Sequence, residues 1–391
     1  MASSVCLHNA TLYSGYSAMS SCAVLIKNGK IIDVFNESRF QQKHFDSDVC
    51  FIDLEGACLA PGFIDTHIHG IEGAGTDDMS AESILKMSEV LPKYGVTSFI
   101  PTLYSAPKDK LFKGMLSIMK AMGHEKGAKI LGMHLEGPFI SPERLGVQTP
   151  ASISPVNLDY MREIISLGQG SIINMTVAPE LKGMRELALL CLEYGIILQA
   201  GHTNATYQQM VEGMQARIMH VTHLFNAMSR IHHRDPGVVG AVFIHPELSC
   251  EIIADGFHIN PEIIKFLLRC KPIDKVVLVT DALKPTKQKA EHLYANGEEV
   301  YLDKCFMRKS DNVIAGSALT MIDGVRNLVS FGLSPEQAVQ TASYNPATIM
   351  KQEHIGLIAP GYDADMVVFD KEFNVLKTII KGNIFEKGIC R

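Results

Sequence analysis

The chain has 391 residues, of which 47% are hydrophobic and 20% are charged, and its formal net charge is -6. This length suits one large domain with a modest second unit, and the composition is typical of a globular protein with a large core. An acidic chain offers no broad basic surface, so nucleic acid is excluded as the expected partner. No run approaches the roughly 18 apolar residues of a membrane span, so we expect no membrane partner. We expect no secretory signal, and nine cysteines without a CxxC pair favour a cytoplasmic protein.

The two ends of the chain have similar β-like patterns. Near the start, two apolar runs flank the Asn28-Gly29 pair, which is a strong signal for a hairpin. Near the end, Ala364–Asp370 is rich in residues that favour strands, and a second β-branched run follows it. We predict that residues 1–60 and 355–391 together form one small β-sandwich domain.

The middle of the chain alternates apolar runs with segments at helical spacing, such as Ala81–Tyr94. Eightfold alternation of strand and helix predicts a (β/α)8 barrel of the TIM type over residues 61–354. An open doubly wound sheet is the main rival, but no GxGxxG motif follows the first strand. The eight apolar runs are Gly62–Gly70, Val96–Leu103, Ile130–Glu136, Ile172–Pro179, Ile196–His202, Arg217–Leu224, Glu251–His258 and Lys275–Asp281.

Potential metal ligands stand at the C-terminal ends of these runs, where a barrel of this type forms its active site. In the segment His67-Ile68-His69, the two histidines are two residues apart, so on a strand both imidazoles point to the same side. Imidazole and carboxylate ligands suit Zn²⁺ or Fe²⁺. The other strand ends supply Glu136, His202, His223, His258 and Asp281.

Five candidate ligands exceed the three that a single catalytic zinc usually takes from the protein. We therefore predict two ions. Glu136, His202 and His223 would hold the principal ion. His67 and His69 would hold a second ion, which Glu136 would bridge. A water on these ions would have its pKa lowered towards about 7 and would become a nucleophile, so the sequence predicts a metal-dependent hydrolase.

The remaining polar strand residues have different expected roles. Asp281 fits a general base that takes a proton from the water and later gives it to a leaving amine. His258 fits a group that orients the substrate or polarises its carbonyl. His134 faces inward but one layer deeper, so we expect a structural role. His220 lies three residues before His223, and alternation along a strand predicts that it faces the helix layer.

A series of longer motifs surrounds these residues. The motifs are PGFIDTHIHG (Pro61–Gly70), GMHLEGPFI (Gly132–Ile140), AGHTNA (Ala200–Ala205), THLFNAM (Thr222–Met228), HHRDPGVVGA (His232–Ala241), ADGFH (Ala254–His258), VTDA (Val279–Ala282), IAGSALTM (Ile314–Met321) and GYDADMVVFD (Gly361–Asp370). Together they resemble the N-acetylglucosamine-6-phosphate deacetylases, a family within the amidohydrolase superfamily. The resemblance runs over nearly the whole chain, and the set is much more specific than any single motif.

The resemblance implies hydrolysis of the acetamide of N-acetylglucosamine 6-phosphate to glucosamine 6-phosphate and acetate, in amino-sugar catabolism or recycling. It assigns the principal metal to Glu136, His202 and His223, and the acid/base role to Asp281. Arg234 would contact the phosphate, which a guanidinium can bind through two hydrogen bonds. Family members are usually dimers or tetramers, so a homo-oligomer is expected. The other implied substrate contacts are Val147, Gln148, Asn226, Ala227, His258, Ile314, Ala315 and Gly316.

Two features distinguish this chain within the resemblance. Some members have Gln and Asn where this chain has His67 and His69, and those members bind one metal. Members with HxH can hold two, and this chain resembles them. Gln148 stands where many members have a substrate-contacting His, and its amide can donate a hydrogen bond but carries no charge.

Two other functions are weighed against the deacetylase. Amidohydrolases that act on other cyclic or acyl amides, such as dihydroorotases and hydantoinases, usually bridge their metals with a carbamylated Lys on the fourth strand. The run Ile172–Pro179 contains no Lys, which counts against them. A non-catalytic scaffold would be expected to have lost ligands or the base, whereas this chain has retained all of them.

Overall fold

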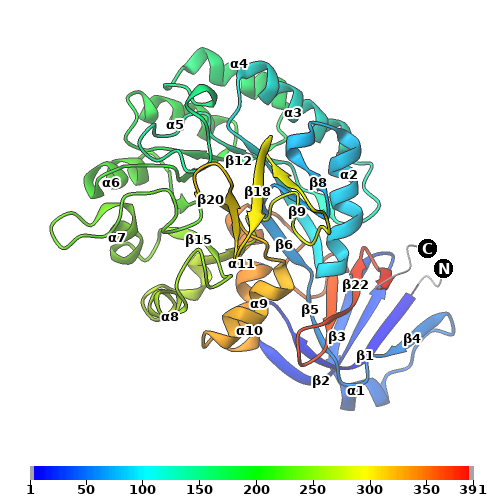
Figure 1. Ribbon diagram of the computed structural model, residues 1–391. Coiled ribbons are helices and arrows are strands. Elements are labelled where there is room, and N and C mark those ends of the chain that lie inside the picture. The colour runs from blue at the N-terminus through cyan, green and yellow to red at the C-terminus, as the bar shows by residue number, and fades with distance from the viewer. Residues whose placement is uncertain (1–3, 387–391) are drawn as a thin grey trace.

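The structure is a computed structural model that describes residues 4–386, and its largest part is a barrel of eight parallel strands (Figure 1). Each strand pairs in parallel with the next, and the ring closes where Ile68 bridges Ala282 and the Asp281 amide donates to the His67 carbonyl at 2.9 Å. All eight predicted runs contribute a barrel strand, which confirms the (β/α)8 prediction. The strands are β6 (Phe63–Ile68), β9 (Val96–Tyr104), β11 (Met133–Glu136), β12 (Ile172–Val177), β13 (Ile197–Ala200), β14 (His220–Val221), β15 (Ser249–Ile253) and β16 (Val276–Val279).

Helices connect the barrel strands and cover the outside of the barrel (Figure 1). Their boundaries follow local sequence signals: Ser80 accepts a hydrogen bond from the Ser83 amide at the start of α2, and Pro261 opens α8 after the cap Asn260. The helices are α2 (Ala81–Val90), α3 (Lys108–Ala121), α4 (Leu158–Gly168), α5 (Met184–Glu193), α6 (Tyr207–Gln215), α7 (Gly237–Ile244), α8 (Pro261–Cys270), α9 (Met321–Ser330), α10 (Pro335–Ala342) and α11 (Tyr344–Ile349). Short 3₁₀ turns are η1 (Thr76–Asp78), η2 (Leu91–Tyr94), η3 (Pro150–Ser152) and η4 (Ile273–Lys275).

Strands from both ends of the chain form a separate sheet beside the barrel (Figure 1). β5 pairs antiparallel with β21, which joins the two ends, and Asn28 and Gly29 turn with φ values of 52° and 74°, as a two-residue hairpin requires. The predicted small β domain is therefore present, and its exact boundaries stay a prediction. Its strands are β1 (Ser4–Tyr13), β2 (Ala18–Lys27), β3 (Lys30–Asn36), β4 (Val49–Asp53), β5 (Cys58–Pro61), β21 (Met366–Phe369), β22 (Val375–Ile380) and β23 (Asn383–Glu386), with α1 (Glu37–Gln42) after β3.

A four-stranded antiparallel sheet is inserted between β16 and α9, and the sequence patterns did not predict it. Figure 1 shows it in front of the barrel strands, and the residue after it, Ser317, bridges Ala282, three residues beyond the end of β16. The insertion is thereby fixed to the end of the barrel that carries the candidate ligands. Its strands are β17 (Leu293–Ala295), β18 (Glu298–Leu302), β19 (Phe306–Arg308) and β20 (Ile314–Gly316), and smaller pieces are β7 (Gly70–Ile71), β8 (Ala74–Gly75) and β10 (Lys129–Ile130).

Residues 4–386 contain no helix that is long and apolar enough to cross a membrane. The eight cysteines in the same range are free of disulfides. The ninth, Cys390, lies outside the described residues.

Candidate active site

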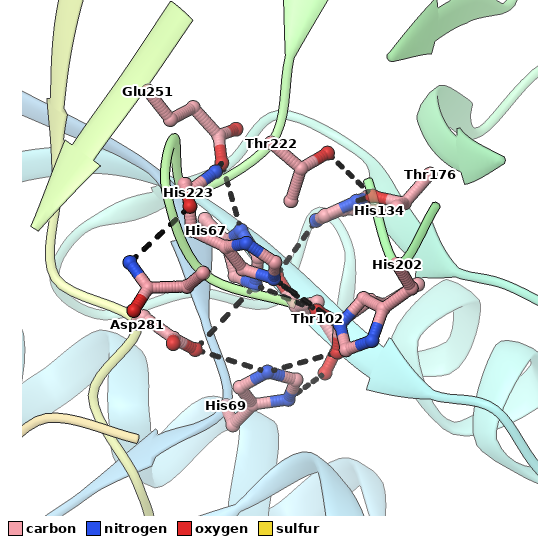
Figure 2. Close-up of polar contacts among 12 residues, drawn as sticks. His67, His69, Thr102, His134, Thr176, His202, Thr222, His223, Glu251 and Asp281 are labelled. Atoms are coloured by element: carbon pink, nitrogen blue, oxygen red, sulfur yellow. Dashed lines mark hydrogen bonds and ion pairs between the residues drawn. The ribbon is translucent and has the colours of Figure 1, made fainter. Parts of the chain in front are cut away.

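Three of the predicted site residues lie two residues after the ends of short barrel strands and have left-handed backbone conformations. The φ angle is 45° at His202, 26° at His223 and 48° at Asp281. For residues other than glycine this region costs on the order of 1–3 kcal/mol, and it persists where the surrounding structure enforces it, often at functional sites. The turns direct these side chains into the mouth of the barrel, where they converge (Figure 2).

Glu136, His202 and His223 form what we call the principal group. Glu136 Oε1 lies 3.0 Å from His202 Nε2 and 3.1 Å from His223 Nε2, and the two Nε2 atoms are 3.2 Å apart. Two ligands at about 2.0–2.1 Å from a tetrahedral ion would be roughly 3.3 Å apart, so these separations match one shared ion. All three residues are buried, and their ligand atoms could hold one metal ion.

His67, His69 and Asp281 form what we call the second group. Asp281 Oδ1 lies 3.5 Å from His67 Nε2 and 3.4 Å from His69 Nε2. Glu136 stands between the groups, since its two oxygens lie 3.6 Å from His67 Nε2 and 3.5 Å from His69 Nε2. The structure thus brings all five predicted ligands together and adds Asp281 to the predicted His67–His69 pair.

Hydrogen bonds at Nδ1 determine which nitrogen three of the imidazoles offer to an ion. Backbone carbonyls lie 3.0 Å from His202 Nδ1 and 3.1 Å from His69 Nδ1, and Glu251 Oε2 lies 3.0 Å from His67 Nδ1. Because these oxygens only accept, Nδ1 carries the proton of the neutral imidazole, and the lone pair of Nε2 is the one offered to an ion. His67 Nε2 is buried and has no hydrogen-bond partner among the described residues, so a metal ion fits it.

Burial and crowding of charges shift the pKa values in both groups. Burial opposes ionisation of Glu136, but the neighbouring imidazoles, His202 first, hold its pKa well below the ordinary value. Burial likewise opposes charge on His67, yet Glu251 and Asp281 raise its pKa to about 10. The pKa of Asp281 is lowered by nearby imidazoles in spite of burial. The carboxylates therefore stay ionised and need positive charge between them, from protons or from a metal ion.

Two other buried histidines, His134 and His220, make polar contacts outside the two metal groups. His134 bonds to the hydroxyls of two threonines at 3.1 and 2.8 Å, and burial lowers its pKa well below the usual value, so it is neutral. The expectation that His220 faces the helix layer is wrong, because its Nε2 lies 3.7 Å from Glu251 Oε1 inside the barrel. The strand β14 ends at Val221, so strand alternation does not extend to His223.

A cavity of about 390 Å³ has both metal groups in its wall, represented by His69, Asp281 and the whole principal group. Its other walls come from loops after β11, β14 and β15 and from the inserted sheet, where β20 contributes three residues. Most of the predicted substrate contacts line it. These are Val147, Asn226, Ala227, His258, Ile314, Ala315 and Gly316.

Two predicted substrate contacts do not line this cavity. Gln148 is buried, and its Nε2 donates to Glu136 Oε2 at 2.8 Å. Arg234 lies on an exposed turn, where its Nη1 is 2.7 Å from His233 Nε2. Arg230 is the one arginine or lysine in the described cavity wall. Its position four residues before Arg234 gave no distinct sequence signal.

Three further residues act on the site and were missed in the sequence. Tyr104 stacks on His69, with ring centroids 3.8 Å apart, and Asp255 Oδ2 accepts from His258 Nδ1 at 2.6 Å. The third is Glu251, whose Oε2 lies 3.0 Å from His67 Nδ1. Tyr104 at the end of a strand and Glu251 within an apolar run were both detectable, because polar atoms in such places require partners.

Comparison with known proteins gives one consistent result. Residues 58–385 match the model of the amidohydrolase family. The N-acetylglucosamine-6-phosphate deacetylase of Vibrio furnissii is 33% identical over 363 residues, covering 92% of this chain and 89% of that protein. The N-acetylgalactosamine-6-phosphate deacetylase of Escherichia coli O157:H7 is 29% identical over 339 residues, with coverage of 86% and 90%. The crystal structure of N-acetylglucosamine-6-phosphate deacetylase from Pasteurella multocida superposes with a TM-score of 0.91 at 28% identity, covering 98% of this chain and 100% of that one.

Proposed function

The chain belongs to the amidohydrolase family, and we propose that it is a deacetylase that hydrolyses N-acetylglucosamine 6-phosphate to glucosamine 6-phosphate and acetate. The observation that carries the proposal is the position of Asp281, which lies against the metal-ligand groups in the wall of a cavity sized for a small molecule. Relatives that are 33% and 29% identical to this chain are named as deacetylases of phosphorylated amino sugars. This reaction would serve amino-sugar catabolism or recycling.

We propose two divalent ions, zinc or iron, one in the principal group and one in the second group. Imidazole nitrogens and carboxylate oxygens are the ligand types that both metals accept. When bound, such ions lower the pKa of a coordinated water towards about 7 and polarise a carbonyl oxygen. Glu136 would link the two groups, because one of its oxygens reaches an imidazole of the principal group and the other reaches an imidazole of the second group.

Asp281 would move the proton in the reaction. Its pKa is lowered by nearby imidazoles, so it is ionised at neutral pH and can accept a proton from the attacking water. The new bond joins the water oxygen to the acetyl carbon. As the C–N bond breaks, the same proton passes from Asp281 to the departing amine nitrogen. The products are then the free amino sugar and acetate.

The substrate would be held by groups at the other end of the cavity. His258 is oriented by Asp255, which fixes the proton on Nδ1 and leaves the buried Nε2 available to the sugar or its carbonyl. We propose that the phosphate is bound by the loop that carries Arg230 and Arg234, since guanidinium groups bind phosphate through paired hydrogen bonds. A homo-oligomer, dimer or tetramer, and a cytoplasmic location are kept as predictions.

The test is metal analysis and acetate release on protein purified without added metal. We expect bound zinc or iron, and acetate release from N-acetylglucosamine 6-phosphate well above that from the unphosphorylated sugar. N-acetylgalactosamine 6-phosphate is the second substrate to assay, because one relative is named for it. Tight metal binding with no acetate from either phosphorylated sugar would refute the proposal.

A further inference from the structure

Glu251 is a carboxylate in the interior of the barrel that the proposed reaction does not use. It lies in the middle of β15, between apolar neighbours, and its side chain is completely buried. A buried carboxylate is costly unless hydrogen bonds and opposite charge surround it. The contacts that satisfy Glu251 therefore indicate what it does.

Both oxygens of Glu251 accept hydrogen bonds from other strands of the barrel. Oε1 accepts from Gln199 Nε2 at 3.1 Å. Oε2 lies 3.0 Å from His67 Nδ1 and 3.1 Å from the backbone nitrogen of His223, which are contacts to one ligand from each metal group (Figure 2). One carboxylate oxygen thus connects β6 with the turn that follows β14.

We infer that Glu251 is a positioning residue, which holds His67 as a ligand of the second ion and ties that ligand to the principal group. The inference rests on the proposed two-ion site. By accepting from Nδ1, Glu251 leaves the lone pair of His67 on Nε2, which is the nitrogen that faces Asp281 and Glu136. A carboxylate behind a ligating histidine fixes both the ring orientation and the position of its proton.

The contact with the main chain gives Glu251 a second effect. His223 has a φ angle of 26°, a conformation rarely adopted by residues other than glycine. Its N–H points at Glu251 Oε2, so the carboxylate helps to hold the strained turn. The side chain of His223 has its own partners in the principal group, so this second effect is expected to be smaller than the effect on His67.

The deciding variant is Glu251→Gln, which preserves size and removes the charge. An amide can no longer accept at both ends, so either the contact with His67 weakens or the amide N–H forces the proton of His67 onto Nε2. We expect the affinity for the second ion to fall by about 10–100-fold. The principal ion is expected to keep its affinity.

The measurement uses full-length protein stripped of metal with a chelator and titrated with Zn²⁺ alone against a chromogenic competitor. Glu247→Gln is the matched control, because Glu247 is a half-exposed carboxylate just before β15 and touches neither metal group. His67→Ala gives the reference for complete loss of the second site. Thermal unfolding of each protein confirms that it is folded.

Each outcome decides a different point. Two ions bound by Glu251→Gln with wild-type affinities would overturn the role of Glu251 and leave the two-ion site standing. A single ion in the wild-type protein would overturn both. Equal weakening of the two ions would show a general structural role and overturn the inference. If Glu251→Gln does not fold, Glu251→Asp decides instead: its carboxylate is one methylene shorter, so the same selective loss of the second ion is expected, and unchanged affinity overturns the inference.

Discussion

The two ends of the active-site cavity are built in different ways. At the metal end, the six candidate ligands lie on barrel strands or within two residues of their ends, and they contact one another at 3.0–3.6 Å. At the substrate end, the lining residues come from loops and from the inserted sheet, and Arg230 is exposed. The strands therefore fix the chemistry, while recognition depends on segments that tolerate change.

The two ends also differ in how much free energy their geometry costs the folded protein. The metal end buries charged groups and holds His202, His223 and Asp281 in left-handed conformations, so its geometry is maintained against strain. At the substrate end, Phe225 and Ala227 also have left-handed φ angles, of 77° and 47°, but the one arginine of the described cavity wall is exposed, so less charge is buried there. Substitutions at the metal end should therefore change metal content and kcat, whereas those at the substrate end should change KM for the phosphorylated sugar.

The largest expected effect comes from Glu136→Gln. Among the described residues, Glu136 is the one whose oxygens reach imidazoles of both groups, and a neutral amide would replace one of those oxygens by an N–H, which cannot ligate a metal ion. Loss of the ions removes several kcal/mol of transition-state stabilisation, so turnover should fall by at least about 10³-fold. Metal analysis should show both ions reduced. A variant that kept two ions and its activity would show that Glu136 does not link the groups.

The next effect separates binding of the principal ion from proton transfer at the same end of the cavity. Asp281→Asn keeps the shape of the side chain but cannot accept a proton, so turnover should fall by at least about 10²-fold. The principal group does not include Asp281, so its ion should stay bound. Steady-state kinetics together with metal analysis provide the check. Turnover close to that of the wild type would mean that Asp281 is not the base.

The difference between the barrel strands at the metal end and the loops at the substrate end also explains which features the sequence predicts. The barrel and five of the ligands follow from apolar periodicity and from residues at strand ends, where the geometry is nearly independent of the loops. The orientation of His220 was predicted wrongly because β14 is only two residues long, so no strand alternation connects it to His223. The role of Glu251 requires the barrel to close so that β15 and β6 lie on either side of β16, and a linear sequence does not specify that contact.

Loop positions were harder to predict for a related reason. The motifs predict that Gln148 contacts the substrate, and the structure places its amide on Glu136. They also predict that Arg234 contacts the phosphate, and in the structure Arg230 of the same loop lines the cavity. Both substrate contacts stay predictions. The inserted sheet β17–β20 consists of strands of three to five residues, too short for periodicity to identify. Such segments take their positions from the barrel beneath them.

At the substrate end, Arg230→Ala and Arg234→Ala should raise KM for N-acetylglucosamine 6-phosphate and leave kcat nearly unchanged. A lost hydrogen bond between charged groups costs about 1.5–3 kcal/mol, so KM should rise roughly 10–100-fold. The unphosphorylated sugar should be unaffected. A rise confined to one variant identifies the arginine that binds phosphate, and equal effects on the two sugars would remove the phosphate assignment from this loop.

The smallest expected effect concerns Gln148, which lies on a substrate loop but contacts a metal ligand. Gln148→Leu keeps the volume and removes the N–H that donates to Glu136 Oε2, and partners of this kind affect activity by about tenfold at the lower end of their range. Gln148→His restores a donor and should recover most of the loss. If the leucine variant instead raises KM and leaves kcat intact, Gln148 belongs functionally to the substrate end. Contact with a metal ligand would then not be enough to assign a residue to the metal end, because Gln148 contacts Glu136 and would still act in substrate binding.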